Sequence, residues 1–237
     1  MPGRFSRTAL LIGEKGLKIL EESKVAVFGL GGVGSFVVEG LARAGVGEFF
    51  LVDFDLVDLS NINRQIHALS ETVGKPKTDL MADRVTRINP CAGVTTLLER
   101  YKPGAGERFF PPGLDYIVDA IDDVGAKVDL ITEACKRRIP VISSMGAGNK
   151  LDPATFRVDD ISRTSVCPLA RAVRRKLRQA GINEGVKVVY SSETPIKPQS
   201  EEEYFLKVPG SISFVPSVAG LIIAGEVVRD LLNKDAG

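Results

Sequence analysis

The chain has 237 residues, 44% of them hydrophobic and 26% charged, which is the composition of a soluble globular protein with a sizeable core. Its formal net charge of +1 gives no general preference for an anionic partner, although a local basic patch can provide one. Three widely separated cysteines without a C-x-x-C pair argue against a structural zinc site, and no apolar run approaches the ~20 residues of a membrane helix. With an odd number of cysteines and no signal peptide, the sequence predicts a cytoplasmic protein.

Predicted strands and helices alternate through the first part of the chain. The strands are short, continuous apolar runs, as in strands that a parallel sheet buries on both faces. In chain order the predicted elements are helix Thr8–Leu20, strand Val25–Phe28, helix Ser35–Ala44, strand Glu48–Val52, helix Pro76–Ile88, strand Val94–Leu98, loop Tyr101–Gly113, strand Asp115–Val118, helix Lys127–Arg137 and strand Val141–Ser144. This order predicts an α/β fold with a Rossmann-like, doubly wound, mainly parallel sheet.

The pattern changes after the glycines at 146 and 148, and the rest predicts a C-terminal mixed α/β extension. It contains one basic helix and three short β-like runs, Thr155–Val158, Val186–Tyr190 and Tyr204–Val208. An acidic loop, Glu201–Glu203, interrupts it, and an apolar helix, Pro216–Leu232, ends it. We interpret residues 1–237 as a single domain. Residues 1–150 would form its nucleotide-binding half, and residues 151–237 its substrate-binding and C-terminal extension.

A glycine-rich turn, GLGGVG, follows the first strand and contains Gly29, Gly31, Gly32 and Gly34. Such a turn brings the N-terminus of the next helix, with its free N–H groups and positive dipole end, close to a bound phosphate. Asp53 ends the second strand, where a carboxylate can accept hydrogen bonds from a ribose. Dehydrogenases share these features, so the turn and the acid predict a nucleotide site without identifying the nucleotide.

Further polar residues after the strands distinguish this site from a hydride-transfer site. They are Asn61, Arg64 and Gln65 after the second strand, Lys77 at the start of the next helix, and Asp122 and Asp123 after the fourth strand. Two cations and an amide can hold a triphosphate, while a carboxylate holds Mg²⁺ against it. Singly, each residue fits an ordinary role, such as a surface ion pair or a helix cap. Together, at consecutive strand ends, they favour a phosphate-handling site.

The order of these motifs resembles that of the ubiquitin-activating-type adenylating enzymes, which include the bacterial enzymes of molybdopterin and thiamine sulfur transfer. The resemblance spans about residues 4–150, and its motifs in chain order are RFSR, GLGGVG, LVDFD, SNINRQ, GKPK and DAIDD. It implies adenylation, in which a carboxylate attacks the α-phosphate of ATP and expels pyrophosphate. Positioning and charge neutralisation do most of the work in such a transfer.

The resemblance also implies roles for individual residues. Gly32 would approach the phosphates, Asp53 would hold the ribose, Asn61, Arg64 and Lys77 would contact phosphates, and Asp122 would bind Mg²⁺. Arg7 resembles an arginine finger that reaches into the neighbouring subunit, which implies a homodimer. Asp55 matches a second acid of open role. For His67 we expect a structural or positioning role, because a carboxylate nucleophile is already ionised at pH 7.

The cysteines leave the carboxylate substrate open. Many relatives adenylate the Gly-Gly end of a ubiquitin-like protein, and some then use a cysteine as acceptor. We expect Cys135 to lie in the core and Cys91 to be structural at the start of a strand. Cys167 heads a helix, where the dipole can lower a thiol pKa, or it is incidental there.

Four arginines form one stripe of a predicted helix, because Arg171, Arg174, Arg175 and Arg178 follow the spacing i, i+3, i+4, i+7. The opposite stripe is apolar and consists of Ala170, Val173, Leu177 and Ala180. The arginine stripe is either a solvated amphipathic face or a surface whose mutual repulsion an RNA backbone would relieve. The second reading predicts a tRNA-binding role for the four arginines.

Five segments placed through the chain resemble the tRNA threonylcarbamoyladenosine dehydratases: RFSRTALLIGEKGL, INRQIHAL, MGAGNKLDP, DISRTSVCPLARAVRRKLR and SSETPIKPQ. The resemblance implies activation of the threonyl carboxylate of a modified adenosine beside the tRNA anticodon. The ureido group of the modification then closes a ring, with net loss of water. Asn149 departs from the pattern, since we expect a glycine there. The rival substrate is a ubiquitin-like sulfur carrier with Cys167 as acceptor, and a non-catalytic nucleotide-binding scaffold is a third reading.

Overall fold

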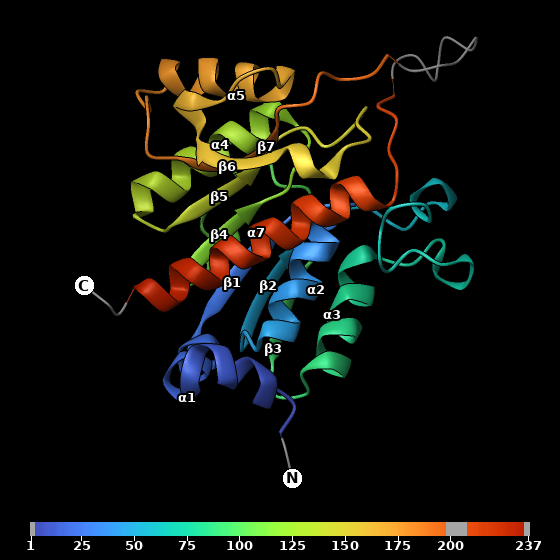
Figure 1. Cartoon of the computed structure of the whole chain (residues 1–237), viewed down its shortest axis with the longest axis vertical. Helices are drawn as coiled ribbons and strands as arrows, with labels where there is room; N and C mark the ends of the chain where they lie inside the picture. Colours follow the sequence, from blue (N-terminus) through green and yellow to red (C-terminus); the bar gives the residue numbers. More distant parts are fainter. Residues whose placement is uncertain (1–2, 198–207, 235–237) are drawn as a thin grey trace.

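The computed structural model describes residues 3–197 and 208–234, and a single twisted sheet runs through the middle of the molecule (Figure 1). The sheet has the strand order β3-β2-β1-β4-β5-β7-β6, and only β6, at one edge, runs antiparallel to its neighbour. The strands are β1 Lys24–Phe28, β2 Glu48–Val52, β3 Gly93–Leu97, β4 Tyr116–Asp119, β5 Val141–Ser144, β6 Phe156–Asp160 and β7 Lys187–Ser191. The predicted Rossmann-like α/β class is confirmed.

Helices cover both faces of this sheet (Figure 1). One face carries α1 (Ser6–Glu22), α2 (Gly34–Ala44), α3 (Lys77–Ile88) and α7 (Phe214–Asn233), whose apolar residues share one core cluster. The other face carries α4 (Val124–Arg137), α5 (Pro168–Gln179) and the segment between β3 and β4, which share a second cluster. Among the described helices, none combines the length and the apolarity that crossing a bilayer requires.

The C-terminal part of the chain completes the sheet and the core that the first part begins. Strands β6 and β7 extend the sheet beyond β5, and α7 packs along α2, the helix that follows the glycine turn. Figure 1 shows α7 crossing the sheet beside α2. The start of α7 therefore lies next to the glycine turn.

The predicted segments agree with these elements except at their ends. The predicted loop after β3 is confirmed as irregular, apart from a short 3-10 turn at Glu107–Phe109. Three of its aromatic side chains, Tyr101, Phe109 and Phe110, are buried against Phe28 of β1, so this segment is anchored to the core. The predicted acidic loop Glu201–Glu203 and all of Tyr204–Val208 except its last residue lie outside the described residues.

Candidate nucleotide site

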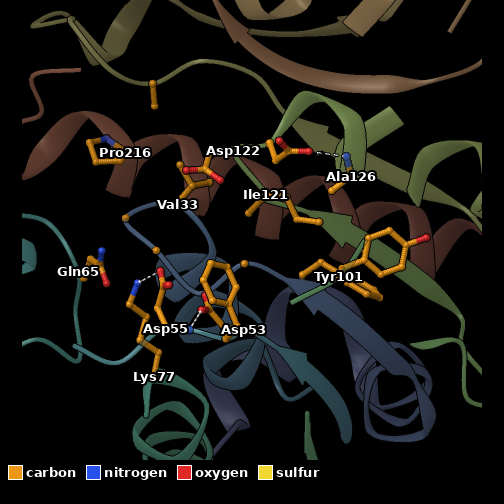
Figure 2. Close-up of a pocket in the computed structure, with 18 of the residues that line it drawn as sticks. Val33, Asp53, Asp55, Gln65, Lys77, Tyr101, Ile121, Asp122, Ala126 and Pro216 are labelled. Atoms are coloured by element: carbon orange, nitrogen blue, oxygen red, sulfur yellow. Dashed lines mark hydrogen bonds and ion pairs between the residues drawn. The ribbon is translucent and has the colours of Figure 1, made fainter. Parts of the chain in front are cut away.

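A cavity of about 830 Å³ opens at the carboxyl ends of β1 and β4. The strand order reverses between these two strands, and open α/β sheets bind their ligands at such a point. Of the predicted site residues, those that line the cavity are Gly29, Gly31, Gly32, Asp53, Asp55, Asn61, Arg64, Gln65, Lys77, Asp122 and Asp123. Figure 2 shows the acids that follow β2 on one side of this cavity and Asp122 on the other.

The glycine turn lets the chain double back from β1 into α2. Gly29 has a φ of +86°, and a Cβ at this position would lie 2.6 Å from the carbonyl oxygen of Ala120. A Cβ on Gly34 would lie within van der Waals overlap of the carbonyl oxygen of Gly29, so the first turn of α2 sits directly against the end of β1. This close packing places the N-terminus of α2 at the cavity, where its free N–H groups can face a phosphate.

Two backbone N–H groups fix the Asp53 carboxylate at the end of β2. Leu30 donates to Oδ2 at 2.6 Å and Asp55 donates to Oδ1 at 2.8 Å. Burial raises the pKa of Asp53, and the two donors act in the opposite direction. Each oxygen keeps a second lone pair, so the carboxylate can still accept hydrogen bonds from ribose hydroxyls.

Lys77 lies at the start of α3 and pairs with Asp55. The Nζ–Oδ2 distance is 2.8 Å, and the Lys77 side chain is 5% exposed whereas that of Asp55 is 44% exposed (Figure 2). The buried ammonium group of Lys77 is therefore paired with the more exposed carboxylate of Asp55. A phosphate that enters the cavity would compete with Asp55 for this cation.

Arg64 and Asn61 come from the turn that follows β2. The Arg64 guanidinium donates to the carbonyl oxygen of Ser60 at 2.8 Å and to Oδ1 of Asn63 at 2.9 Å. Within the described residues it forms no ion pair with a carboxylate, and burial lowers its pKa. Oδ1 of Asn61 accepts the N–H of Asp58, which leaves the amide nitrogen as a donor. These groups offer positive charge and N–H donors that suit phosphate oxygens.

The two acids after β4 have different environments. Asp123 is the N-cap of α4, because its Oδ1 accepts the N–H of Ala126 at 2.7 Å. Asp122 lines the cavity, is exposed, and makes no side-chain hydrogen bond within the described chain. The helix-cap role therefore belongs to Asp123, and the Asp122 carboxylate is available to a ligand.

A buried network that the sequence did not reveal fixes the turn before Asp122. Nζ of Lys127 lies 2.7 Å from Oδ2 of Asp119 and donates to Oγ of Ser143 at 3.2 Å. Both charged side chains are fully buried, and Oδ1 of Asp119 accepts the N–H of Ile121 at 3.1 Å. A buried ion pair of this kind is costly to break, so it holds the end of β4 in one conformation.

No group of three or more His, Cys, Asp or Glu side chains within the described residues could enclose a metal ion. Mg²⁺ differs from the metals that need such a group, because it binds through one or two carboxylates and completes its shell with phosphates and water. The free carboxylate of Asp122 fits that mode.

Gln65 and His67 are buried beside the site with unpartnered atoms. Oε1 of Gln65 and both ring nitrogens of His67 have no hydrogen-bond partner in the described structure. Burial, followed by the nearby cations Lys77 and Arg84, lowers the pKa of His67 to about 4. The ring is therefore neutral near pH 7, and it does not line the cavity.

The lining of the cavity also includes residues that sequence reasoning missed. Arg100 stacks over the Phe54 ring, with its guanidinium carbon 3.7 Å from the ring centre, and both side chains line the cavity with Tyr101 and Lys102. A purine base can stack on such a surface, which combines an aromatic ring with a guanidinium group. The only signal available was the position of residues 99–102 directly after a parallel strand.

Several predicted residues lie away from the cavity. Arg7 is exposed on α1 and does not line it. Cys167 is only 3% exposed and also lies outside its lining, whereas Cys91 and Cys135 are exposed. The expectations of a core Cys135 and a strand-bound Cys91 were wrong. Cys135 falls at the edge of the buried stripe of α4, and β3 begins only at Gly93.

The basic stripe of α5 is divided by its contacts. Arg171, Arg175 and Arg178 are exposed, but Arg174 is half-buried and donates to the carbonyl oxygen of Thr164 at 2.7 Å. The predicted apolar stripe is buried except at its last residue, Ala180, which is exposed because the helix ends at Gln179.

The sequence profile of the ThiF family matches residues 5–237. The chain is 51% identical over 240 residues to a tRNA threonylcarbamoyladenosine dehydratase from Bacillus subtilis, a match that covers 97% of this chain and 94% of that protein. Its fold superimposes on the Escherichia coli tRNA N6-threonylcarbamoyladenosine dehydratase with a TM-score of 0.92 for the complex with AMP, at 35% identity, and of 0.90 for the complex with ATP, at 34% identity. Both matches cover 98% of this chain and 95% of the other.

A molybdopterin-synthase adenylyltransferase from Escherichia coli is similar over a shorter region, with 35% identity over 147 residues that cover 59% of this chain and 57% of that protein. The similarity to the dehydratase from Bacillus subtilis thus covers nearly the whole chain, whereas this one covers little more than half of it. With a match over nearly its whole length, the chain belongs to the ThiF family.

Proposed function

We propose that this protein is an ATP-dependent tRNA threonylcarbamoyladenosine dehydratase, which adenylates the threonyl carboxylate and so drives ring closure. The observation that carries the proposal is a cavity at the switch point of the sheet that combines Asp53, Arg64, Lys77 and a free Asp122 carboxylate. The similarity to proteins named for this activity extends over nearly the whole chain.

The cavity gives each part of ATP a partner. The ribose would lie at Asp53, and the base would extend toward Phe54 and Arg100 on the same rim. The phosphates would lie over Gly32, between Arg64 and Lys77. Mg²⁺, bound by Asp122, would neutralise phosphate charge and favour departure of pyrophosphate.

The reaction would proceed in two balanced steps. A carboxylate oxygen of the substrate bonds to the α-phosphorus while the bond to pyrophosphate breaks. The ureido group then bonds to the activated carboxyl carbon and loses a proton, while the bond from that carbon to the AMP oxygen breaks. The carboxylic acid form of the nucleoside has then lost one oxygen to AMP and two protons, the elements of water. Because the second nucleophile belongs to the same molecule, its effective concentration is high and no enzyme cysteine or strong base is required.

Arg7 completes this proposal only if a second subunit is present. It is exposed on α1 together with Leu10 and Leu11, whose side chains are 85% and 88% exposed, and a homodimer would cover such apolar residues. We propose that Arg7 then reaches the neighbouring site and contacts phosphate there. Residues 1–150 would bind the nucleotide and residues 151–237 the RNA, in the cytoplasm.

A ubiquitin-like sulfur carrier remains the second candidate substrate, because a molybdopterin-synthase adenylyltransferase is among the relatives. Its similarity covers 59% of this chain. Cys167, which would be the acceptor in this second reading, is buried outside the cavity lining, which favours the tRNA substrate.

The deciding experiment is mass analysis of nucleosides from threonylcarbamoyladenosine-containing tRNA after incubation with the protein, ATP and Mg²⁺. We expect the modified nucleoside to lose one water and pyrophosphate to be released, while Arg64→Ala and Asp122→Ala abolish both. Equal pyrophosphate release with unmodified tRNA, or with a Gly-Gly protein instead, would contradict the proposed substrate.

A further inference from the structure

One wall of the cavity is built by two segments that are distant in the sequence. Ala147 and Gly148 come from the loop after β5, and Pro209, Gly210 and Ser211 come from the segment that leads into α7. A Cβ on Gly148 would lie 2.8 Å from Cβ of Pro209, so the two segments approach as closely as a glycine permits. This wall, residues 209–211 against 147–148, contains no charged side chain.

Asn149, which stands where we expected a glycine, has a left-handed backbone conformation. Its φ is +58°, a conformation that asparagine tolerates better than most residues. The side chain is used as well, because Oδ1 accepts the N–H of Gly210 at 2.6 Å. The Asn149 backbone N–H donates to the carbonyl oxygen of Gly210 at 2.7 Å, and its own carbonyl oxygen accepts the N–H of Ile196 at 2.8 Å. A glycine here would satisfy the backbone but lose the side-chain bond.

Asn63 holds the same wall from the opposite side. Its Nδ2 donates to the carbonyl oxygen of Ser211 at 2.9 Å, while its Oδ1 accepts from the Arg64 guanidinium at 2.9 Å. One amide thus joins the wall to a cation of the phosphate site. Pro216 packs against Gly32, where a Cβ would lie 3.2 Å from atoms of the proline ring.

The wall therefore lies beside residues of the proposed phosphate site. Gly32 packs against Pro216 at the start of α7, and Arg64 bonds to Asn63, which bonds to Ser211 of the wall. A carboxylate that attacks a phosphate has to enter past a surface that adds no negative charge of its own. The neutral wall meets this requirement.

We propose that Asn149 and Asn63 are positioning residues, which clamp residues 209–211 so that this wall orients the substrate's carboxyl group toward the α-phosphate. The inference rests on the proposed function and deepens it. Neither residue touches the reacting atoms, and each acts through one defined hydrogen bond to the wall. Asn149 bonds to no residue that the proposed function assigns to ATP, whereas Asn63 also bonds to Arg64 of the phosphate site.

The same substitution at the two positions tests this idea. Asn149→Asp keeps an acceptor for the Gly210 N–H, whereas Asn63→Asp keeps the acceptor for Arg64 but loses the donor to Ser211. Asn149→Gly keeps the backbone conformation and removes only the side-chain bond. We expect Asn149→Gly to raise the KM for modified tRNA about tenfold, the loss of roughly one hydrogen bond, with an unchanged Kd for ATP. Asn63→Asp should raise this KM by a similar factor, and because its new carboxylate pairs with Arg64 it should also weaken ATP binding. Asn149→Asp should stay within about twofold of the wild type.

The measurements are dehydration kinetics with modified tRNA, ATP calorimetry and thermal melting of each full-length variant. Equal effects of the two Asp variants would assign the change to charge and overturn the clamp. An unchanged KM in Asn149→Gly, with normal wild-type turnover, would overturn this inference alone. A wild-type protein that binds ATP but does not dehydrate the tRNA would instead overturn the proposed function, and the inference with it.

Discussion

His67, the only histidine of the chain, shows how the site tolerates a buried polar side chain. Its two ring nitrogens have no partner among the described residues, and burial beside Lys77 and Arg84 depresses its pKa to about 4. The neutral ring adds no charge near the cations that would bind phosphate. In the unfolded chain the same group titrates near its ordinary pKa of about 6.5.

This difference predicts a pH-dependent stability. Between pH 6.5 and 4 the unfolded state binds a proton at His67 that the folded state does not, so stability is lost as the pH falls through this window. The loss is at most roughly 3 kcal/mol for a shift of this size. We expect His67→Gln to lose less unfolding free energy than the wild type between pH 7 and pH 4 in urea titrations. Identical pH profiles would mean that His67 is solvated in the folded protein.

At the scale of the element, the four arginines of the predicted stripe on α5 differ in burial. Arg174 turns back to Thr164 and ties the helix to the segment before it, while Arg171, Arg175 and Arg178 remain exposed. Periodicity places side chains on a face, but it does not show which of them find a partner in a neighbouring loop. Only the exposed three are suited to a nucleic-acid backbone.

We therefore predict that neutralising two exposed arginines, Arg171→Gln and Arg175→Gln, weakens tRNA binding. Because each phosphate contact contributes close to one unit to the slope of log K against log salt, the slope should fall by roughly 2. The matched control, Arg174→Gln, should lower the melting temperature and leave the salt slope unchanged. If the wild type, the variant with both Arg171→Gln and Arg175→Gln, and the Arg174→Gln control all have the same slope, α5 is a solvated surface helix without a role in tRNA binding.

The same distinction explains how much of the fold and the site followed from the sequence. Apolar runs, the glycine turn and Pro76 located the elements of the doubly wound sheet, because strand and helix periodicities are local properties. The rule that ligands bind beyond the carboxyl ends of strands placed Asp53, Arg64 and Asp122 together. The buried Lys127–Asp119 pair, the clamp of Asn149 on Gly210 and the stack of Arg100 on Phe54 depend on pairs brought together only by folding.

At the scale of the whole molecule, Arg7 lies outside the cavity of its own chain, and the proposed homodimer would bring it to the cavity of the partner. If the arginine acts in the neighbouring site, mixing Arg7→Ala with Arg64→Ala subunits should restore activity that neither variant has alone. A symmetric dimer with random exchange would recover roughly a quarter of the wild-type rate. The measurement is dehydration after subunit exchange, with the mass of the complex recorded in parallel. No recovery in a mixed dimer would place the action of Arg7 within its own subunit.

The packing of α7 on α2 has a consequence for the order of events on the ribosome. The helix comes from residues 214–233, yet its Pro216 lies over the glycine turn near the beginning of the chain. A nascent polypeptide can form the first strands early, because domains fold as their sequence emerges. It cannot finish the nucleotide cavity until α7 has left the exit tunnel. Until then the apolar surface of α2 that packs against α7 stays uncovered, and transiently exposed apolar surface of this kind is prone to aggregation.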